Sequence, residues 1–318
     1  MAFRSNQLRD KGISALVLLC LLAIQSMPAN AVVPGCEGAG PYTPYAAPVV
    51  DMRSPVADVT VIVMHGKGGS PNATFLQDLS GRLAAAGYNV IAPWMTWSRN
   101  WDGTHCQGLN YLDSLVDAER AAGRRVVVVG HSMGGMHALI YGSLAGSKIP
   151  AVVAIAPGHF LSTNPNSSLM QAIAPYVSKA QDLVMQGLGD VVSYELYTLN
   201  GSQLQQTVTT PNIYLSFHSL SYFPAISDVL SQVNLPVHWI AGSEDPLTSN
   251  YITYDMFGMM PYNAHSLFEV LPGDHYTVVP VSGPAFDAWF RGWWPPATPT
   301  GPTPVPPGNE AINYLLLD

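Results

Sequence analysis

The chain has 318 residues and a formal net charge of −8 at pH 7, and Asp, Glu, Lys and Arg together make up only 11% of it. This length allows one large domain with a sizeable core, or two small ones. The acidic balance and the lack of a basic cluster argue against nucleic acid as a partner.

The N-terminal stretch has the pattern of a secretory signal peptide over residues 1–31. Arg4, Arg9 and Lys11 form a basic start, an apolar run follows at 13–24, and the sequence PANA then has the A-x-A spacing of a signal-peptidase site. A membrane anchor is the alternative, but the apolar run is shorter than the ~20 residues that span a bilayer. We therefore expect cleavage near Ala31, export to the periplasm or the medium, and no membrane span in the mature chain.

Cysteine usage agrees with export. Of the three cysteines, Cys20 lies in the predicted signal, which leaves Cys36 and Cys106 as a pair in an oxidising compartment. We expect a disulfide that ties the N-terminal arm to the loop after the second core strand. Two free buried thiols are the alternative.

After residue 31, the first segment is expected to be an extended arm, and an alternation of strands and helices follows it. The arm, residues 32–58, is rich in Pro, Gly and Ala. The next predicted elements, in chain order, are strand 59–65, helix 72–87, strand 88–93, helix 108–123, strand 125–130, helix 133–146 and strand 149–157. Apolar strands without polar alternation are typical of a parallel sheet covered on both faces. The alternation therefore predicts an α/β fold with a doubly wound, mostly parallel sheet.

The alternation stops at Gly158. Residues 159–233 contain helical pieces and an aromatic, serine-rich stretch, and they are predicted to be a cap inserted above the sheet rather than a separate domain. The last predicted elements are strands 235–242 and 266–273 and helix 284–294, which complete a domain over 59–294. The tail, residues 295–318, is Pro-rich and is expected to be extended for most of its length.

The sequence Gly130-His131-Ser132-Met133-Gly134 has the pattern G-x-S-x-G between a predicted strand and a predicted helix. Such a turn is sharp and crowds the backbone, so glycines are needed on both sides of the serine. The turn raises the serine hydroxyl above the sheet, where it can act as a nucleophile. A purely structural serine in a tight turn is the alternative.

A serine nucleophile needs a base, and the base needs a group that orients it. Of the nine histidines, His275 has the right place because it follows the last predicted strand. Asp245 follows the preceding strand and is the preferred acid, with Glu244 as the alternative. Asp274 is adjacent to His275 in sequence and is interpreted as a loop carboxylate.

The order Ser132, Asp245, His275 is that of α/β-hydrolases. With the motifs HGKGGS, GHSMGG, GSEDPL and GDHY, residues 59–294 resemble the α/β-hydrolase superfamily, most closely small exported bacterial serine esterases and lipases. The resemblance implies an oxyanion hole made by the backbone N–H groups of Met133 and Lys67. An ordinary Gly-rich turn and a phosphate-binding loop are the alternatives for HGKGGS. The phosphate-binding loop needs the pattern G-x-x-x-x-G-K-[ST], which is missing. We expect the Lys67 side chain to point to solvent; a position facing the pocket would favour an anionic substrate group.

Pocket walls are harder to assign than the catalytic groups. Trp94 and Trp97 follow a core strand at the edge where open α/β sheets bind ligands, and His159 begins the predicted cap. These residues either line the substrate pocket or pack beneath the cap. The histidines and cysteines show no metal-ligand spacing, so neither a metal nor another cofactor is predicted.

These observations favour an exported serine hydrolase that cleaves carboxylic esters of small molecules through an acyl-serine intermediate. The same triad also serves thioesterases, amidases, peptidases and perhydrolases, and these remain open. A catalytically silent, hydrolase-like binding protein is a further alternative, because fold similarity alone does not specify function.

Overall fold

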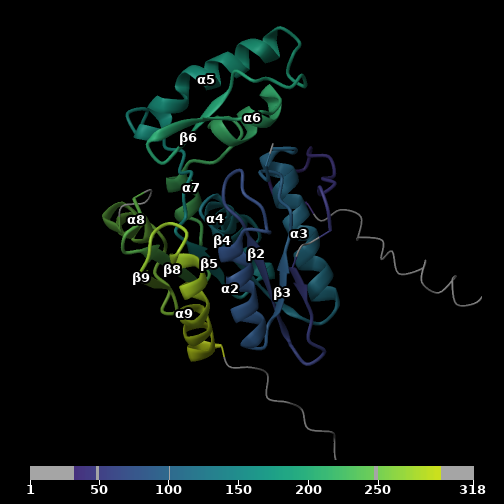
Figure 1. The fold of residues 1–318 in the computed structure, drawn as a ribbon, viewed down its shortest axis with the longest axis vertical. Helices are drawn as coiled ribbons and strands as arrows, with labels where there is room; N and C mark the ends of the chain where they lie inside the picture. Colours follow the sequence, from purple (N-terminus) through teal and green to yellow (C-terminus); the bar gives the residue numbers. More distant parts are fainter. Residues whose placement is uncertain (1–31, 48–49, 100, 247–249, 295–318) are drawn as a thin grey trace, which may run out of the picture.

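The computed structural model describes residues 32–47, 50–99, 101–246 and 250–294 (Figure 1). The predicted signal peptide and the Pro-rich tail lie outside the described residues. Within the described part, no helix is both long and apolar enough to cross a membrane.

A seven-stranded sheet forms the centre of the main body, in the order β1-β3-β2-β4-β5-β8-β9. Every neighbouring pair is parallel except β1 and β3, which are antiparallel. The sheet is therefore the predicted mostly parallel α/β sheet. Its strands are β1 (Val50–Met52), β2 (Val59–Met64), β3 (Asn89–Ala92), β4 (Arg125–His131), β5 (Val152–Ile155), β8 (Val237–Gly242) and β9 (Leu267–Leu271).

Helices pack on both faces of the sheet. Helices α2 (Thr74–Ala85) and α9 (Val278–Trp293) bury their apolar sides on one face, and α3 (His105–Ala121) and α4 (Met133–Ala145) cover the other. Every residue of β2 is buried, which explains why its sequence is apolar except for Thr60, whose hydroxyl donates to Glu119.

The structure corrects three details of the sequence interpretation. The arm contains strand β1, which the sequence did not predict because three residues are too few to show a strand pattern. Helix α9 begins at Val278 rather than at Pro284, which lies inside it. Helix α3 begins at His105, because the side chain of Thr104 caps it and accepts a hydrogen bond from the Gln107 amide.

The cap segment, residues 159–233, contains helix α5 (Ser168–Met185), the hairpin of β6 (Tyr197–Asn200) and β7 (Gln203–Gln206), and helices α6 (Pro211–His218) and α7 (Ile226–Leu230). Figure 1 shows α5, β6 and α6 together beyond one end of the sheet, with α7 between them and the main body. The remaining short helices are η1 (Gly146–Lys148) and α8 (Asn250–Phe257).

The expected disulfide joins Cys36 to Cys106, whose Cα atoms are 5.1 Å apart. Cys106 lies in the first turn of α3, not in a loop as expected, because the Thr104 cap starts the helix earlier. Asn110 adds two hydrogen bonds to the same arm: its side chain accepts from the Val33 amide and donates to the Cys36 carbonyl. The arm is thus held along α3.

Replacement of both cysteines by serine should lower the free energy of unfolding by about 2–4 kcal/mol, because the bond closes a loop of 70 residues in the unfolded chain. Urea unfolding without reductant measures this difference. Reductant should bring the wild type to the stability of the variant and leave the variant unchanged. Equal stability without reductant would contradict the prediction.

Candidate active site

Ser132 lies at a strained turn between β4 and α4. Its φ of 55° and ψ of −120° are values that a side chain disfavours, and it is one of five described non-glycine residues with positive φ. Two hydrogen bonds hold the turn: the Ser132 amide donates to the Ile155 carbonyl at the end of β5, and the Ser132 carbonyl accepts from the Gly158 amide in the segment after β5. Strain of this kind is maintained by the surrounding structure, here the end of β5 and the residues that follow it.

The two glycines of the motif are required by space. A Cβ on Gly130 would overlap the carbonyl group of Gly134, and a Cβ on Gly134 would lie 2.7 Å from the backbone oxygens of Met64 and His65. Both contacts are with backbone, which has little freedom to yield. The nucleophile turn and the end of β2 therefore pack directly against each other.

His275 and Asp245 are brought together from loops that follow neighbouring strands, β9 and β8. The His275 Nδ1 atom donates to Asp245 Oδ2 at 2.8 Å, and both side chains are buried. This bond places the proton on Nδ1 in the neutral ring and leaves Nε2 as the basic atom. Glu244 is exposed, whereas the Asp274 carboxylate accepts from the amides of Tyr276 and Thr277 within its own turn.

His131, the residue before Ser132, anchors the loop that carries His275. His131 Nε2 donates to the backbone carbonyl of His275 at 2.8 Å. Burial lowers the pKa of His131 to about 3, so this ring is neutral at ordinary pH and serves as a structural donor. Ser132 and His275 line the same cavity.

The loop of residues 65–69, which we call the oxyanion loop after the role that the family resemblance implies for it, lies against Ser132. A Cβ on Gly66 would be 3.0 Å from Ser132 Cβ and 3.4 Å from Ser132 Oγ, so only glycine fits there without displacement. The next residue is Lys67, and Met133 is the first residue of α4. The first amides of a helix have no partner within the helix, which leaves that of Met133 available for an oxyanion.

The side chain of Lys67 does not point to solvent, and that expectation was wrong. It is partly buried and turns toward the cap hairpin, where Nζ donates to Leu199 O at 2.8 Å and to Thr198 Oγ1 at 3.2 Å. Burial lowers the pKa of Lys67 to about 7. The physical reason is that the cap folds over the loop and offers backbone and hydroxyl acceptors, which the sequence of the loop does not reveal.

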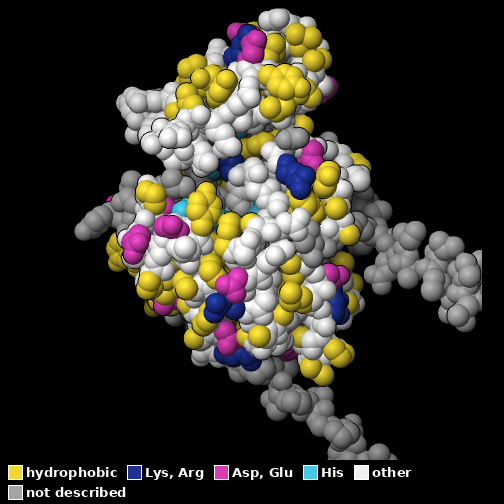
Figure 2. Space-filling model, viewed as in Figure 1, with side chains coloured by type: hydrophobic (Ala, Val, Ile, Leu, Met, Phe, Trp, Pro, Cys, Tyr) yellow, Lys and Arg dark blue, Asp and Glu magenta, His cyan; other side chains and the backbone are white. Residues whose placement is uncertain are grey.

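The cavity at Ser132 has a volume of about 440 Å³. Figure 2 shows the molecule hollowed between the cap and the main body. The described lining of this cavity includes the predicted Ser132, His275, Lys67 and His159. Further residues come from the segment after β5, from the cap, from α8 and from the turn after α8. These are Gly158, Phe160, Ser162, Thr163, Ser167, Ser168, Leu169, Leu199, Asn200, Gly201, Ile226, Ser227, Met256 and Met259.

Trp94 and Trp97 do not belong to this lining. Both are buried, and Trp97 packs beneath the oxyanion loop, where its Nε1 donates to the His65 carbonyl at 2.9 Å. The Trp97 ring stacks on His137 at 4.0 Å, and Trp94 packs against Arg99. Of the two interpretations of these tryptophans, the structure favours packing. Large apolar rings fill space under a glycine-rich loop that cannot fill it alone.

A buried pair of histidines, His105 and His137, supports the start of α4. Neither residue was among the predicted site residues. His137 Nδ1 donates to the Met133 carbonyl at 2.9 Å, and its Nε2 accepts from His105 Nδ1 at 3.0 Å. Burial lowers the pKa of His137 to about 3, so the ring is neutral. The position of His137 four residues after Met133, one helical turn away, was a usable signal.

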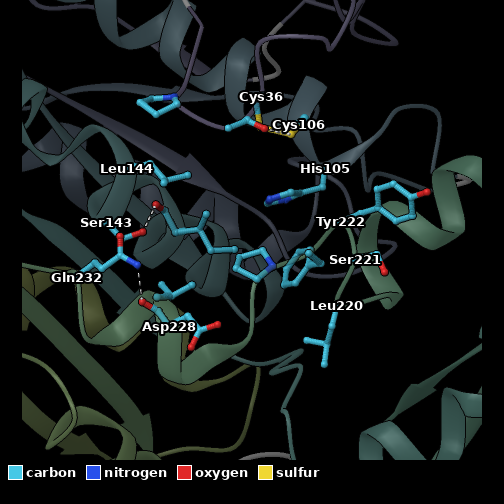
Figure 3. Close-up of a pocket in the computed structure, with 16 residues that line it drawn as sticks. Cys36, His105, Cys106, Ser143, Leu144, Leu220, Ser221, Tyr222, Asp228 and Gln232 are labelled. Atoms are coloured by element: carbon cyan, nitrogen blue, oxygen red, sulfur yellow. Dashed lines mark hydrogen bonds between the residues drawn. A yellow bond between two sulfur atoms is a disulfide. The ribbon is translucent and has the colours of Figure 1, made fainter.

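A second cavity of about 290 Å³ lies beside the disulfide and contains neither Ser132 nor His275 (Figure 3). His105 reaches toward it from α3, and Gln232 and Ser143 lie on another side (Figure 3). The hydrogen bonds drawn there are local ones, from Gln232 to the Asp228 carbonyl and from Ser143 to the Ile140 carbonyl. The described residues form no group of three His, Cys, Asp or Glu that could hold a metal.

A profile of the alpha/beta hydrolase family matches residues 61–286, which is most of the chain. The chain belongs to the alpha/beta hydrolase family. Its seven-stranded sheet agrees with this membership. A comparison with curated protein sequences found no match.

Solved structures with the same fold are distant in sequence. Est1E from Butyrivibrio proteoclasticus is 15% identical, with a TM-score of 0.53 over 76% of this chain and 91% of its own. The Paleococcus ferrophilus monoacylglycerol lipase is 17% identical, with a TM-score of 0.52 over 74% and 93%. DcsB in complex with its substrate analogue is 13% identical, with a TM-score of 0.56 over 74% and 92%. At these sequence identities, the similarity to the three structures shows a shared fold alone.

The packing at the nucleophile turn predicts a contrast between two glycine substitutions. Gly134→Ala should lower the free energy of unfolding by about 1–3 kcal/mol, because its methyl group meets two carbonyl oxygens at 2.7 Å. Gly81→Ala is the matched control, since Gly81 lies within α2 with open space at its Cβ, and it should be neutral or stabilise by up to about 1 kcal/mol. Urea unfolding of both variants checks the contrast, and equal effects would refute it.

Proposed function

We propose that this hydrolase is a serine esterase in which Ser132, His275 and Asp245 form the catalytic triad. The observation that carries the proposal is the 2.8 Å hydrogen bond between His275 and Asp245 at a cavity shared with Ser132. Family membership supports hydrolysis in general. A fold neighbour described as a monoacylglycerol lipase supports the ester as the scissile group.

In the proposed reaction, His275 Nε2 takes the proton of Ser132 Oγ as this oxygen attacks the ester carbonyl. Asp245 holds the ring in the orientation and tautomer that leave Nε2 basic, and it stabilises the imidazolium that forms. The backbone N–H groups of Met133 and Lys67 stabilise the negative oxygen. His275 then protonates the leaving alcohol, and a water activated by the same ring releases the acid from the acyl-serine.

We further propose that the enzyme is exported with residues 1–31 removed as a signal peptide. The Cys36–Cys106 bond supports this, because disulfides persist mainly in oxidising compartments. N-terminal sequencing of the exported protein tests it: a first residue near Val32 is expected, and an intact Met1 would refute cleavage.

Ser132→Ala should abolish hydrolysis of p-nitrophenyl esters and labelling by a fluorophosphonate, because both reactions require the Oγ nucleophile. Circular dichroism and thermal unfolding should show that the fold survives. Ser143→Ala is the matched control, since Ser143 lies on α4 away from the cavity at Ser132. Undiminished labelling of the Ser132 variant would contradict the assignment, and a wild type that is never labelled would indicate a silent binding protein.

Asp245→Asn should reduce kcat for the same esters by about 10³–10⁴-fold, because an amide at this position favours the wrong tautomer of His275. Glu244→Gln, at the exposed neighbouring position, should change kcat little. Steady-state kinetics of the two variants separate the candidate acids, and the opposite order of effects would reassign the role to Glu244. Thioesters and amides in the same panel test the other acyl substrates.

A further inference from the structure

The cavity at Ser132 has an unusual charge balance. Among its described lining residues, Lys67 is the only charged side chain, and no Asp or Glu contributes to the wall. The ion pairs found among the described residues do not include Lys67. A partly buried ammonium group thus lines the same cavity as the nucleophile without a carboxylate partner in the described protein.

The partners of Lys67 are neutral, and their hydrogen-bond directions are determined. His218 Nδ1 lies 2.9 Å from the Tyr214 carbonyl and must donate to it, so Nε2 of the neutral ring is an acceptor. Thr198 Oγ1, 2.8 Å from that Nε2, therefore donates its hydrogen to His218 and accepts from Lys67. The hydrogen bonds from Lys67 Nζ to Thr198 and Leu199 use two of the three N–H groups of the ammonium, so one N–H donor remains. Because both acceptors are neutral, they do not cancel the positive charge.

The titratable groups that face Lys67 from the cap do not balance this charge. These groups are His159 and His218, and burial followed by the charge of Lys67 lowers the pKa of both, that of His218 to about 3. Both rings are neutral at ordinary pH. A buried cation without a counter-ion is unfavourable, so an anion that enters the cavity with the substrate would gain a strong partner.

We propose that Lys67 binds an anionic group of the substrate, so that the enzyme prefers esters carrying a carboxylate, such as hemiesters of dicarboxylic acids. This inference rests on the proposed esterase function and names its substrate class. Lys67 thereby has two roles: its backbone amide stabilises the oxyanion, and its side chain selects the substrate.

The test compares p-nitrophenyl esters in pairs of equal chain length: the hemisuccinate with the butyrate, the hemiglutarate with the valerate, and the hemiadipate with the hexanoate. The quantity measured is the ratio of kcat/KM for the charged ester to that for the neutral ester. The wild type should favour the charged member of at least one pair. Lys67→Met should lower that ratio about tenfold or more, because a hydrogen-bonded charge interaction is lost. Lys67→Arg should retain most of the preference.

Lys179→Met is the control for general electrostatics, because Lys179 is an exposed cap lysine on α5 that pairs with Glu195. It should leave the ratio unchanged. A ratio in Lys67→Met equal to that of the wild type would overturn the inference. Any effect of the substitution on the oxyanion loop itself acts on both members of a pair and cancels in the ratio.

The pH dependence of the ratio supplies a second readout. Burial lowers the pKa of Lys67 to about 7, so the wild-type preference should be greatest below pH 7 and decrease as the pH rises through 7 to 9. Lys67→Arg should show a flat ratio over this range, since guanidinium remains charged. Any effect of pH on the catalytic step itself acts on both esters of a pair and cancels in the ratio. A flat wild-type profile together with an unchanged Lys67→Met ratio refutes a role for the ammonium group.

Failure of the inference can be told apart from failure of the proposed function. If the wild type hydrolyses neutral esters and Ser132→Ala does not, but no charged ester is preferred, the function holds and the inference is wrong. If neither kind of ester is hydrolysed, calorimetric titration of the wild type and of Lys67→Met with adipate tests the anion site independently of catalysis. Weaker binding to Lys67→Met than to the wild type would support the anion site, whereas equal or absent binding would refute it.

Discussion

The crowded backbone at Ser132 is the constraint on which the rest of the site depends. The positive φ of this residue persists because two hydrogen bonds hold its backbone, one to the Ile155 carbonyl at the end of β5 and one from the Gly158 amide in the segment after it. Since Gly134 packs on the backbone end of β2, the nucleophile turn and the oxyanion loop occupy one rigid arrangement. The strained turn therefore places Ser132 directly before the first turn of α4 and beside Gly66.

Three buried histidines hold the loops around this turn. His65 donates to the Gly66 carbonyl, His131 to the His275 carbonyl and His137 to the Met133 carbonyl, so each ring fixes one part of the site. Burial lowers their pKa values to about 4, 3 and 3. In the unfolded chain they would protonate near the ordinary value of about 6.5. The unfolded state therefore binds more protons as the pH falls below that value, and the free energy of unfolding decreases there.

The sheet was predictable because buried parallel strands favour long apolar runs, as in most of β2 and in the four valines of β4. The candidate triad was accessible for a related reason: parallel strands end at one edge, so Asp245 and His275 follow their strands into the same region. Elements that depend on tertiary contacts could not be predicted from the sequence. Strand β1 has only three residues, and the hairpin of β6 and β7 is largely polar, with every residue of β7 exposed.

Lys67 shows why the substrate pocket was the least predictable part. The glycines around it were readable as a loop that approaches the nucleophile, but the direction of its side chain depends on Thr198 and Leu199, more than 130 residues later. That contact joins the oxyanion loop to the cap hairpin. A shift of the hairpin would move the ammonium group and, through the same residue, the backbone amide proposed to bind the oxyanion. In the proposed mechanism, substrate recognition by the cap and stabilisation of the oxyanion are therefore physically coupled at Lys67.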